Sequence, residues 1–158
     1  MNHLERLAVE WFEYNDYIVK KNTKVGPRPN GGWEGELDIV AYHPQTKHFI
    51  HIEASMGVEK WTKREGKFAK KFKLGRKYIP QIFPWIRAET NLEQWAILPA
   101  SNINYDTIGG GKVVPLRDFV KKITDSIRKR GHVLHSAIPE HFPSNINIRQ
   151  QRVHDDAS

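Results

Sequence analysis

Apolar residues recur along this chain with two different periods, and the change of period separates helices from strands. In residues 3–15 they fall at every third or fourth position, which is the stripe of an amphipathic helix. In residues 36–41 and 48–54 they alternate with polar residues, as in strands with one buried face. The turn-forming residues 43–47 lie between these two strands and predict a β-hairpin.

The same signals place the other elements. A strand at 17–25 precedes a loop rich in glycine and proline at 26–32, and a long helix at 58–79 ends before Pro80. After it we expect an irregular or edge segment containing Phe83, Trp85 and Ile86, then strands at 94–98 and 112–114 and a helix at 115–130 with Gly131 as its C-cap. The predicted fold is therefore an α/β domain in the order α-β-β-β-α-β-β-α, with helices on both faces of a central mixed sheet.

The length of 158 residues fits one domain. We place this domain at 1–131 and expect 132–158, which are polar and lack periodicity, to form an extended or partly disordered tail. The absence of cysteine excludes disulfides, a thiolate zinc site and a cysteine nucleophile. The acidic, amphipathic N-terminus does not look like a signal peptide, and no run approaches the about 20 apolar residues of a membrane span. We therefore expect a cytoplasmic protein that does not partner a membrane.

The charge of the chain is unevenly distributed. The net charge is +7, and residues 59–77 carry nine Lys and Arg against two Glu. A basic balance of this kind indicates a polyanionic partner, most often nucleic acid. A solvated helix face has the same composition, so both interpretations of the basic run stay open.

Two acidic residues, Asp38 and Glu53, lie inside the two strands of the predicted hairpin. Strand alternation places Glu36 on the same face as Asp38, and places His51 and Ser55 on the same face as Glu53. If the strands pair with their apolar sets on one side, the two carboxylates converge on the other. Unpaired carboxylates among apolar neighbours are unfavourable, and oxygen ligands of this kind suit Mg²⁺. The alternative is a solvated sheet face on which both acids pair with lysines.

The segments GELDIVA (35–41) and HFIHIEAS (48–55), set between a helix and a basic helix, resemble the PD-(D/E)xK superfamily of restriction-endonuclease-like nucleases. Within it they are similar to branches related to Holliday-junction resolvases. The resemblance covers roughly residues 3–80. It implies a restriction-endonuclease-like core and a DNA endonuclease that depends on Mg²⁺ or Mn²⁺.

Carried onto this chain, the resemblance makes Asp38 and Glu53 metal ligands and adds the backbone carbonyl of Ala54. The family often supplies a further acid from the first helix, for which Glu5 is the candidate; an exposed acid favoured by the helix dipole is the alternative interpretation of Glu5. Glu36 could bind a second metal or a lysine.

Ser55 departs from the family, which has a lysine at this position. Three explanations stay open: the lysine has moved to the following helix, where Lys60, Lys63 and Lys67 are candidates; the metal acts with Ser55 orienting water; or the domain has lost cleavage and kept binding. We favour the first because that helix is rich in lysine.

The predicted partner is DNA, bound through its phosphates by the basic helix and stacked on an exposed tryptophan. The predicted contact residues are Lys60, Lys63, Arg64, Lys67, Lys70, Lys71 and Trp33. Two other functions stay open: a catalytically inactive nucleic-acid-binding module of the same fold, and a nuclease-like subunit of a larger defence or mobile-element complex. The resemblance also implies a homodimer that cuts both strands.

Overall fold

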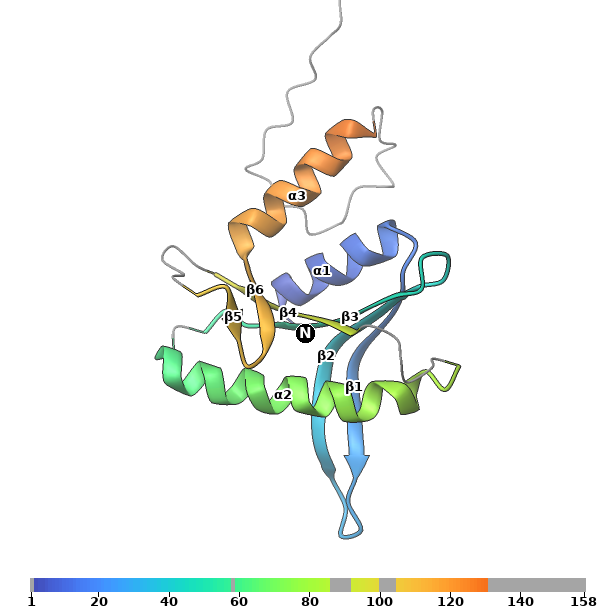
Figure 1. The fold of residues 1–158 in the computed structure, drawn as a ribbon, viewed down its shortest axis with the longest axis vertical. Helices are drawn as coiled ribbons and strands as arrows, with labels where there is room; N and C mark the ends of the chain where they lie inside the picture. Colours follow the sequence, from blue (N-terminus) through green and yellow to red (C-terminus); the bar gives the residue numbers. More distant parts are fainter. Residues whose placement is uncertain (1, 58, 86–91, 100–104, 131–158) are drawn as a thin grey trace, which may run out of the picture.

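A mixed sheet of six strands forms the centre of the molecule in the order β1-β2-β3-β4-β6-β5 (Figure 1). The computed structural model describes residues 2–57, 59–85, 92–99 and 105–130. The elements are α1 (His3–Tyr14), β1 (Ile18–Pro27), β2 (Trp33–His43), β3 (His48–Ala54), α2 (Trp61–Ile82), β4 (Leu92–Leu98), β5 (Thr107–Ile108), β6 (Gly111–Pro115) and α3 (Leu116–Lys129). The first three strands are antiparallel, β4 is parallel to both β3 and β6, and β5 is antiparallel to β6. The predicted α/β class with a mixed sheet is confirmed, and the arrangement is consistent with a restriction-endonuclease-like core.

Helices cover both faces of this sheet (Figure 1). The apolar stripe of α1 and the inner face of α3 form one core with the alternate residues of β2, β3 and β4. On the other face α2 packs through Phe68 and Phe72 against the β4–β6 side, and through Leu74 and Ile79 against β2 and β3. A solvated sheet face is therefore the wrong interpretation for the acidic side of the hairpin, because α2 lies across it. The other part of that interpretation, the pairing of both acids with a lysine, is found in the structure, at Lys71.

Helix α2 and the short strand β5 differ from the predicted elements. Helix α2 does not end before Pro80 but continues through it to Ile82. Proline at position 80 removes the backbone donor to the carbonyl of residue 76. The helix nevertheless continues past it, and Phe83 N–H donates to the carbonyl of Ile79 at 3.1 Å. The two-residue strand β5 was not predicted because it is too short to show a period.

Some predictions concern residues outside the described ranges: those for Ile86, for Gly131 and for the tail at 132–158. Among the helices of the described ranges, none is long and apolar enough to cross a membrane.

The alternation of β2 is interrupted at Asp38. Leu37 packs with Val40 in the core beneath α2, instead of sharing a face with Ile39. In the neighbouring strand β1 the register places Asn22 beside this point, and Asn22 has a positive φ of 48°. The strict alternation predicted over residues 36–41, which would place Leu37 on the same face as Ile39, is therefore wrong at Leu37, because the backbone is distorted where β2 approaches the acidic cluster.

Glycine allows α2 to approach the sheet closely. A Cβ on Gly75 of α2 would lie 2.2 Å from His51 Nδ1 in β3, and a Cβ on Gly109 would lie 2.3 Å from the backbone nitrogen of Ala69 in α2. Any side chain at these positions would push the helix outward. These contacts set the distance between α2 and the sheet, and therefore the depth to which each α2 side chain reaches toward the strands.

Candidate active site

The candidate site forms where β2 and β3 stop pairing. Their pairing ends at Ile39 with Ile52, and each of these residues is adjacent in sequence to one of the acids, Asp38 and Glu53. Beyond it, each carboxylate accepts a hydrogen bond from the opposite strand. Asp38 N–H donates to Glu53 Oε1 at 3.2 Å, and Ala54 N–H donates to Asp38 Oδ2 at 3.3 Å. The side chains thus replace the ladder, and each is fixed through one of its two oxygens.

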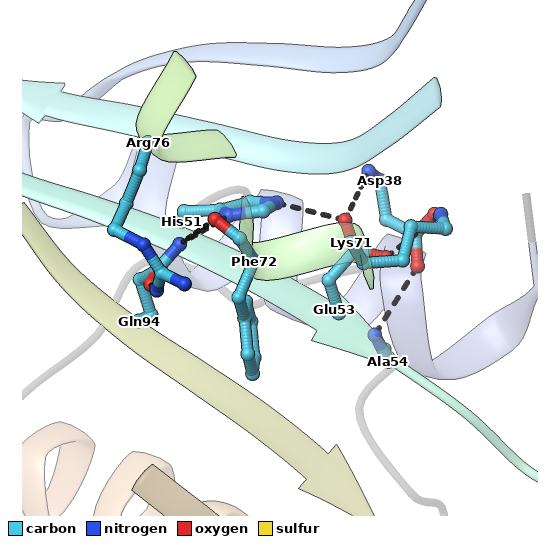
Figure 2. Close-up of polar contacts among 8 residues, drawn as sticks. All are labelled: Asp38, His51, Glu53, Ala54, Lys71, Phe72, Arg76 and Gln94. Carbon is cyan, nitrogen blue, oxygen red and sulfur yellow. Dashed lines mark hydrogen bonds and ion pairs between the residues drawn. The ribbon is translucent and has the colours of Figure 1, made fainter. Parts of the chain in front are cut away.

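The second oxygen of each carboxylate points to a single ammonium group, that of Lys71 on α2 (Figure 2). Lys71 Nζ lies 2.8 Å from Asp38 Oδ1 and 2.8 Å from Glu53 Oε2. The side chains are 18% exposed for Asp38, 3% for Glu53 and 34% for Lys71, so the cluster is reached by solvent from the lysine side. The predicted convergence of Asp38 and Glu53 is confirmed. Their role as metal ligands stays a prediction.

Burial and mutual repulsion perturb the ionisation of all three groups. Burial, with the charge of Glu53 adding to it, raises the pKa of Asp38 from 3.8 to about 6 even though Lys71 opposes the change. Burial also raises the pKa of Glu53, against the hydrogen bonds from Asp38 and Lys71. Burial disfavours the charged form of Lys71, but the two carboxylates outweigh it and raise its pKa. Two carboxylates that resist ionisation beside one cation form a site that gains from a second positive charge.

A pocket of about 190 Å³ opens beside these three side chains, between the end of β3 and the first half of α2. Its lining also includes Ala54, Ser55, Glu59, Arg64, Lys67 and Phe68. The hydroxyl of Ser55 accepts a hydrogen bond from Gly57 N–H at 3.3 Å. Ser55 therefore borders the pocket, and its hydroxyl is engaged by the backbone of Gly57.

The lysines predicted to replace the family lysine are not the one that pairs with the two acids. Lys67 borders the pocket, but its Nζ pairs with Glu59 Oε1 at 2.5 Å. Lys63 pairs with the same oxygen at 3.6 Å, and Lys60 is exposed just before α2 begins. Among the described residues it is Lys71, which we had predicted only as a DNA contact, that reaches the carboxylates.

A sequence signal for Lys71 does exist. It lies one helical turn after Lys67 in the i, i+4 row of Lys63, Lys67 and Lys71, and it is adjacent to Phe72 on the apolar face. A lysine at the border of the buried face is the one whose side chain reaches into the interior. The predicted residues Lys60, Lys63 and Lys67 are closer to Ser55 in sequence. Helix α2 passes over the acids only further along, at Lys71.

The other predicted site residues lie around the cluster. Glu5, in the first turn of α1, forms a capping box with Asn2, whose backbone and side chain occupy both of its oxygens. Burial raises the pKa of Glu5 and the charge of Asp38 adds to this, so Glu5 borders the site without lining the pocket. Glu36 is half-buried in β2 and does not line the pocket either. Trp33 is 46% exposed at the start of β2, as the stacking prediction requires.

The donor set fits a hard divalent cation that needs few protein ligands. Within the described residues, no group of three or more His, Asp or Glu side chains is arranged as a complete metal cage. Two carboxylate oxygens do meet at one cation position, each 2.8 Å from Lys71 Nζ. Mg²⁺ is usually held by one or two carboxylates and completes its shell with water and substrate phosphate. Two carboxylates are too few for a closed structural zinc site. They are the donor type that suits Mg²⁺ or Mn²⁺, but both free oxygens are paired with Lys71 Nζ in this structure, and binding of an ion here stays a prediction.

Comparison with known proteins does not assign the chain to a family. No protein-family model matches the chain, and no curated protein matches its sequence. The resemblance to PD-(D/E)xK nucleases therefore rests on the sequence segments 35–41 and 48–55 and stays a prediction.

Proposed function

We propose that the protein is a DNA endonuclease that depends on Mg²⁺ or Mn²⁺ and hydrolyses phosphodiester bonds at the Asp38–Glu53–Lys71 cluster. The observation that carries this proposal is the position of Lys71 Nζ, 2.8 Å from an oxygen of each acid. Lys71 supplies from a helix the positive charge that Ser55, directly after β3, cannot supply. The two acids and the lysine of the family motif are then all present, with the lysine contributed by another element.

Each residue of the cluster has a distinct part in this reaction. When bound, the divalent ion would lower the pKa of a water molecule and neutralise charge on the scissile phosphate. Asp38 Oδ1 and Glu53 Oε2 would hold the ion, since their other oxygens are occupied by backbone N–H groups. Lys71 would donate a hydrogen bond to the phosphate or to the attacking water and so stabilise the charge that develops in the transition state.

The charge of α2 supports a nucleic-acid substrate. Lys63, Lys67 and Lys70 are exposed on α2, and Lys60 is exposed just before it; of these four, Lys67 lines the pocket. Backbone phosphates bind such a surface without regard to base sequence. DNA is the proposed nucleic acid because of the resemblance to resolvase-related nucleases.

A cleavage assay tests the proposal. Linear duplex, single-stranded and branched DNA are incubated with the protein in Mg²⁺, Mn²⁺ or EDTA. We expect cleavage in either metal and none in EDTA. Asp38→Asn, Glu53→Gln and Lys71→Met should each lower the rate by at least about 100-fold. Lys121→Met is the matched control, because Lys121 is exposed on α3 at the opposite face of the sheet; its rate should match wild type.

The outcomes separate the open interpretations. DNA binding without cleavage in any metal would identify a binding module. Cleavage that survives Lys71→Met would show that Lys71 is not needed for the reaction, and would favour the explanation in which the metal acts with Ser55 orienting the water.

A further inference from the structure

Two buried polar side chains, His51 and Gln94, lie on the side of Glu53 away from Asp38 and Lys71 (Figure 2). Neither lines the pocket. His51 Nε2 is 2.7 Å from Glu53 Oε1, and His51 Nδ1 is 3.1 Å from Gln94 Nε2. Gln94 also contacts the backbone carbonyl of Phe72 and the guanidinium of Arg76. His51 is fully buried and Gln94 is 8% exposed, so these groups depend on one another for hydrogen bonds.

The direction of each hydrogen bond follows from the two groups that cannot change role. Arg76 can only donate, so the Gln94 atom facing it is the oxygen. The carbonyl of Phe72 can only accept, so Gln94 Nε2 donates to it at 2.9 Å. The second hydrogen of the Gln94 amide then points to His51 Nδ1, which must accept and therefore carries no proton. The remaining ring proton is on Nε2, and it points at Glu53 Oε1.

We propose that His51 is a positioning residue for Glu53, held by Gln94 and Arg76 as the neutral Nε2–H tautomer that donates to Oε1 and leaves Oε2 to the metal. This proposal rests on the proposed function, because it names the support of the same metal site. Glu53 Oε1 then accepts two neutral donors, the Nε2–H of His51 and the backbone N–H of Asp38. With Oε1 held twice, the carboxylate cannot rotate, and Oε2 stays beside Lys71 Nζ at 2.8 Å. Removing a hydrogen-bond donor that holds a metal-ligating side chain commonly lowers metal affinity or activity by about 10–100-fold.

The packing around His51 supports a fixed ring. The Phe72 ring meets the imidazole edge-on, with centroids 5.4 Å apart and planes at 88°. Gly75 contacts the other side so closely that a Cβ there would lie 2.2 Å from Nδ1 and 3.1 Å from Gln94 Nε2. Within six residues, helix α2 therefore supplies Lys71 to the site and supplies Phe72, Gly75 and Arg76 to the surroundings of His51 and Gln94.

The first experiment reads the tautomer directly. Imidazole ¹⁵N–¹H correlation spectra of the metal-free full chain at neutral pH distinguish the Nε2–H, Nδ1–H and doubly protonated forms. The His51 signals are assigned among the eight histidines by their absence in His51→Leu. We expect a single neutral Nε2–H form in wild type, and loss of that single form in Gln94→Met, which cannot donate to Nδ1. An Nδ1–H form, or a ring that exchanges between forms in wild type, would overturn the proposal.

The second experiment measures Mn²⁺ affinity by electron paramagnetic resonance, together with cleavage kinetics. His51→Leu should weaken Mn²⁺ binding by about tenfold or more and lower kcat while leaving the KM for DNA unchanged. His51→Gln retains a donor at a similar reach and should recover most of the affinity. Gln94→Met should lie between them, and it keeps the test informative if His51→Leu does not fold. Thr124→Val, a buried polar residue of α3 on the opposite face, is the control and should bind Mn²⁺ like wild type.

The results distinguish the two proposals. If wild type binds Mn²⁺ and cleaves DNA but His51→Leu and Gln94→Met do the same, the positioning role is wrong and the proposed function stands. If wild type neither binds Mn²⁺ nor cleaves, the proposed function is wrong and the metal-positioning role is overturned with it.

Discussion

Replacing Asp38 by asparagine should make the metal-free protein more stable while it removes the proposed activity. The pKa of Asp38 is raised from 3.8 to about 6, first by burial and then by the charge of Glu53. At about 1.4 kcal/mol for each unit of pKa, ionising this carboxyl destabilises the folded state by about 3 kcal/mol once the pH exceeds 6. Asparagine keeps an oxygen for the N–H of Ala54 but loses the ion pair with Lys71, so we expect a net gain of about 1–3 kcal/mol near pH 8.

The sign of this effect depends on pH in a defined way. Because the folded-state pKa is raised, the protonated carboxyl favours folding below pH 3.8, and this contribution is lost as the pH rises through about 6. The advantage of Asp38→Asn should therefore shrink to about 1 kcal/mol near pH 4.5 and vanish at lower pH. Urea unfolding in EDTA, followed by circular dichroism near pH 8 and near pH 4.5, measures both values.

A matched control and a metal titration complete this test. Asp118→Asn, at an exposed aspartate of α3 whose side chain is 58% exposed, should change the free energy of unfolding by no more than about 0.5 kcal/mol at either pH. Mg²⁺ at ten times its dissociation constant should stabilise wild type by about 1.4 kcal/mol and Asp38→Asn by much less. An Asp38→Asn protein that is destabilised equally at both pH values would refute the reasoning, because its hydrogen bonds would then outweigh the cost of its charge.

Four further results are expected. Lys71→Met should tighten Mn²⁺ binding by severalfold in the same resonance assay, since the ammonium competes for oxygens that lie 2.8 Å from it; weaker binding would contradict this. Gly75→Ala should lower the free energy of unfolding in urea by about 1–3 kcal/mol despite the better helix propensity of alanine, because its Cβ would lie 2.2 Å from His51 Nδ1; a more stable variant would show that the contact can relax. Ser55→Lys should reduce cleavage by about tenfold, because it adds a second ammonium to the pocket that Lys71 already borders; a faster enzyme would show that Lys71 does not fill the role. DNA affinity measured by fluorescence anisotropy should fall steeply with salt, and Lys70→Glu should reduce the slope by about one counterion; affinity independent of salt would leave α2 a solvated face.

The part of the site that the sequence predicts is the part that depends on local geometry. Asp38 and Glu53 belong to two strands joined by a short turn, so alternation and a hairpin are enough to bring their side chains together. The same holds for the amphipathic helices, whose stripes appear as the cores on the two faces of the sheet. The interruption at Leu37 was missed because a positive φ in the partner strand leaves no trace in the hydrophobic pattern.

The part that was missed depends on contacts between distant elements. Lys71 reaches Asp38 across 33 residues of sequence, and Gln94 reaches His51 across 43. The direction and depth of α2 over the sheet decide both contacts, and neither is encoded by a local period. His51 illustrates the same limit: strand alternation placed it on the acidic face, but only the covering helix makes it a fully buried group.

A lysine on a helix makes the proposed chemistry depend on packing between layers. A lysine at position 55, directly after β3, would have been held near Glu53 by the end of the strand alone. On α2, the distance from Lys71 Nζ to the two acids changes whenever the helix moves relative to the sheet. Gly75 lies one turn further along α2 and contacts His51, which in turn donates to Glu53. The contact between Gly75 and His51 therefore sets the distance of α2 from the sheet, and the same histidine orients the Glu53 carboxylate. The positions of Lys71 and of Glu53 thus both depend on His51. A substitution at Gly75 should accordingly disturb the Lys71 and His51 contacts of Glu53 together, whereas one at Ser55 should disturb only the pocket.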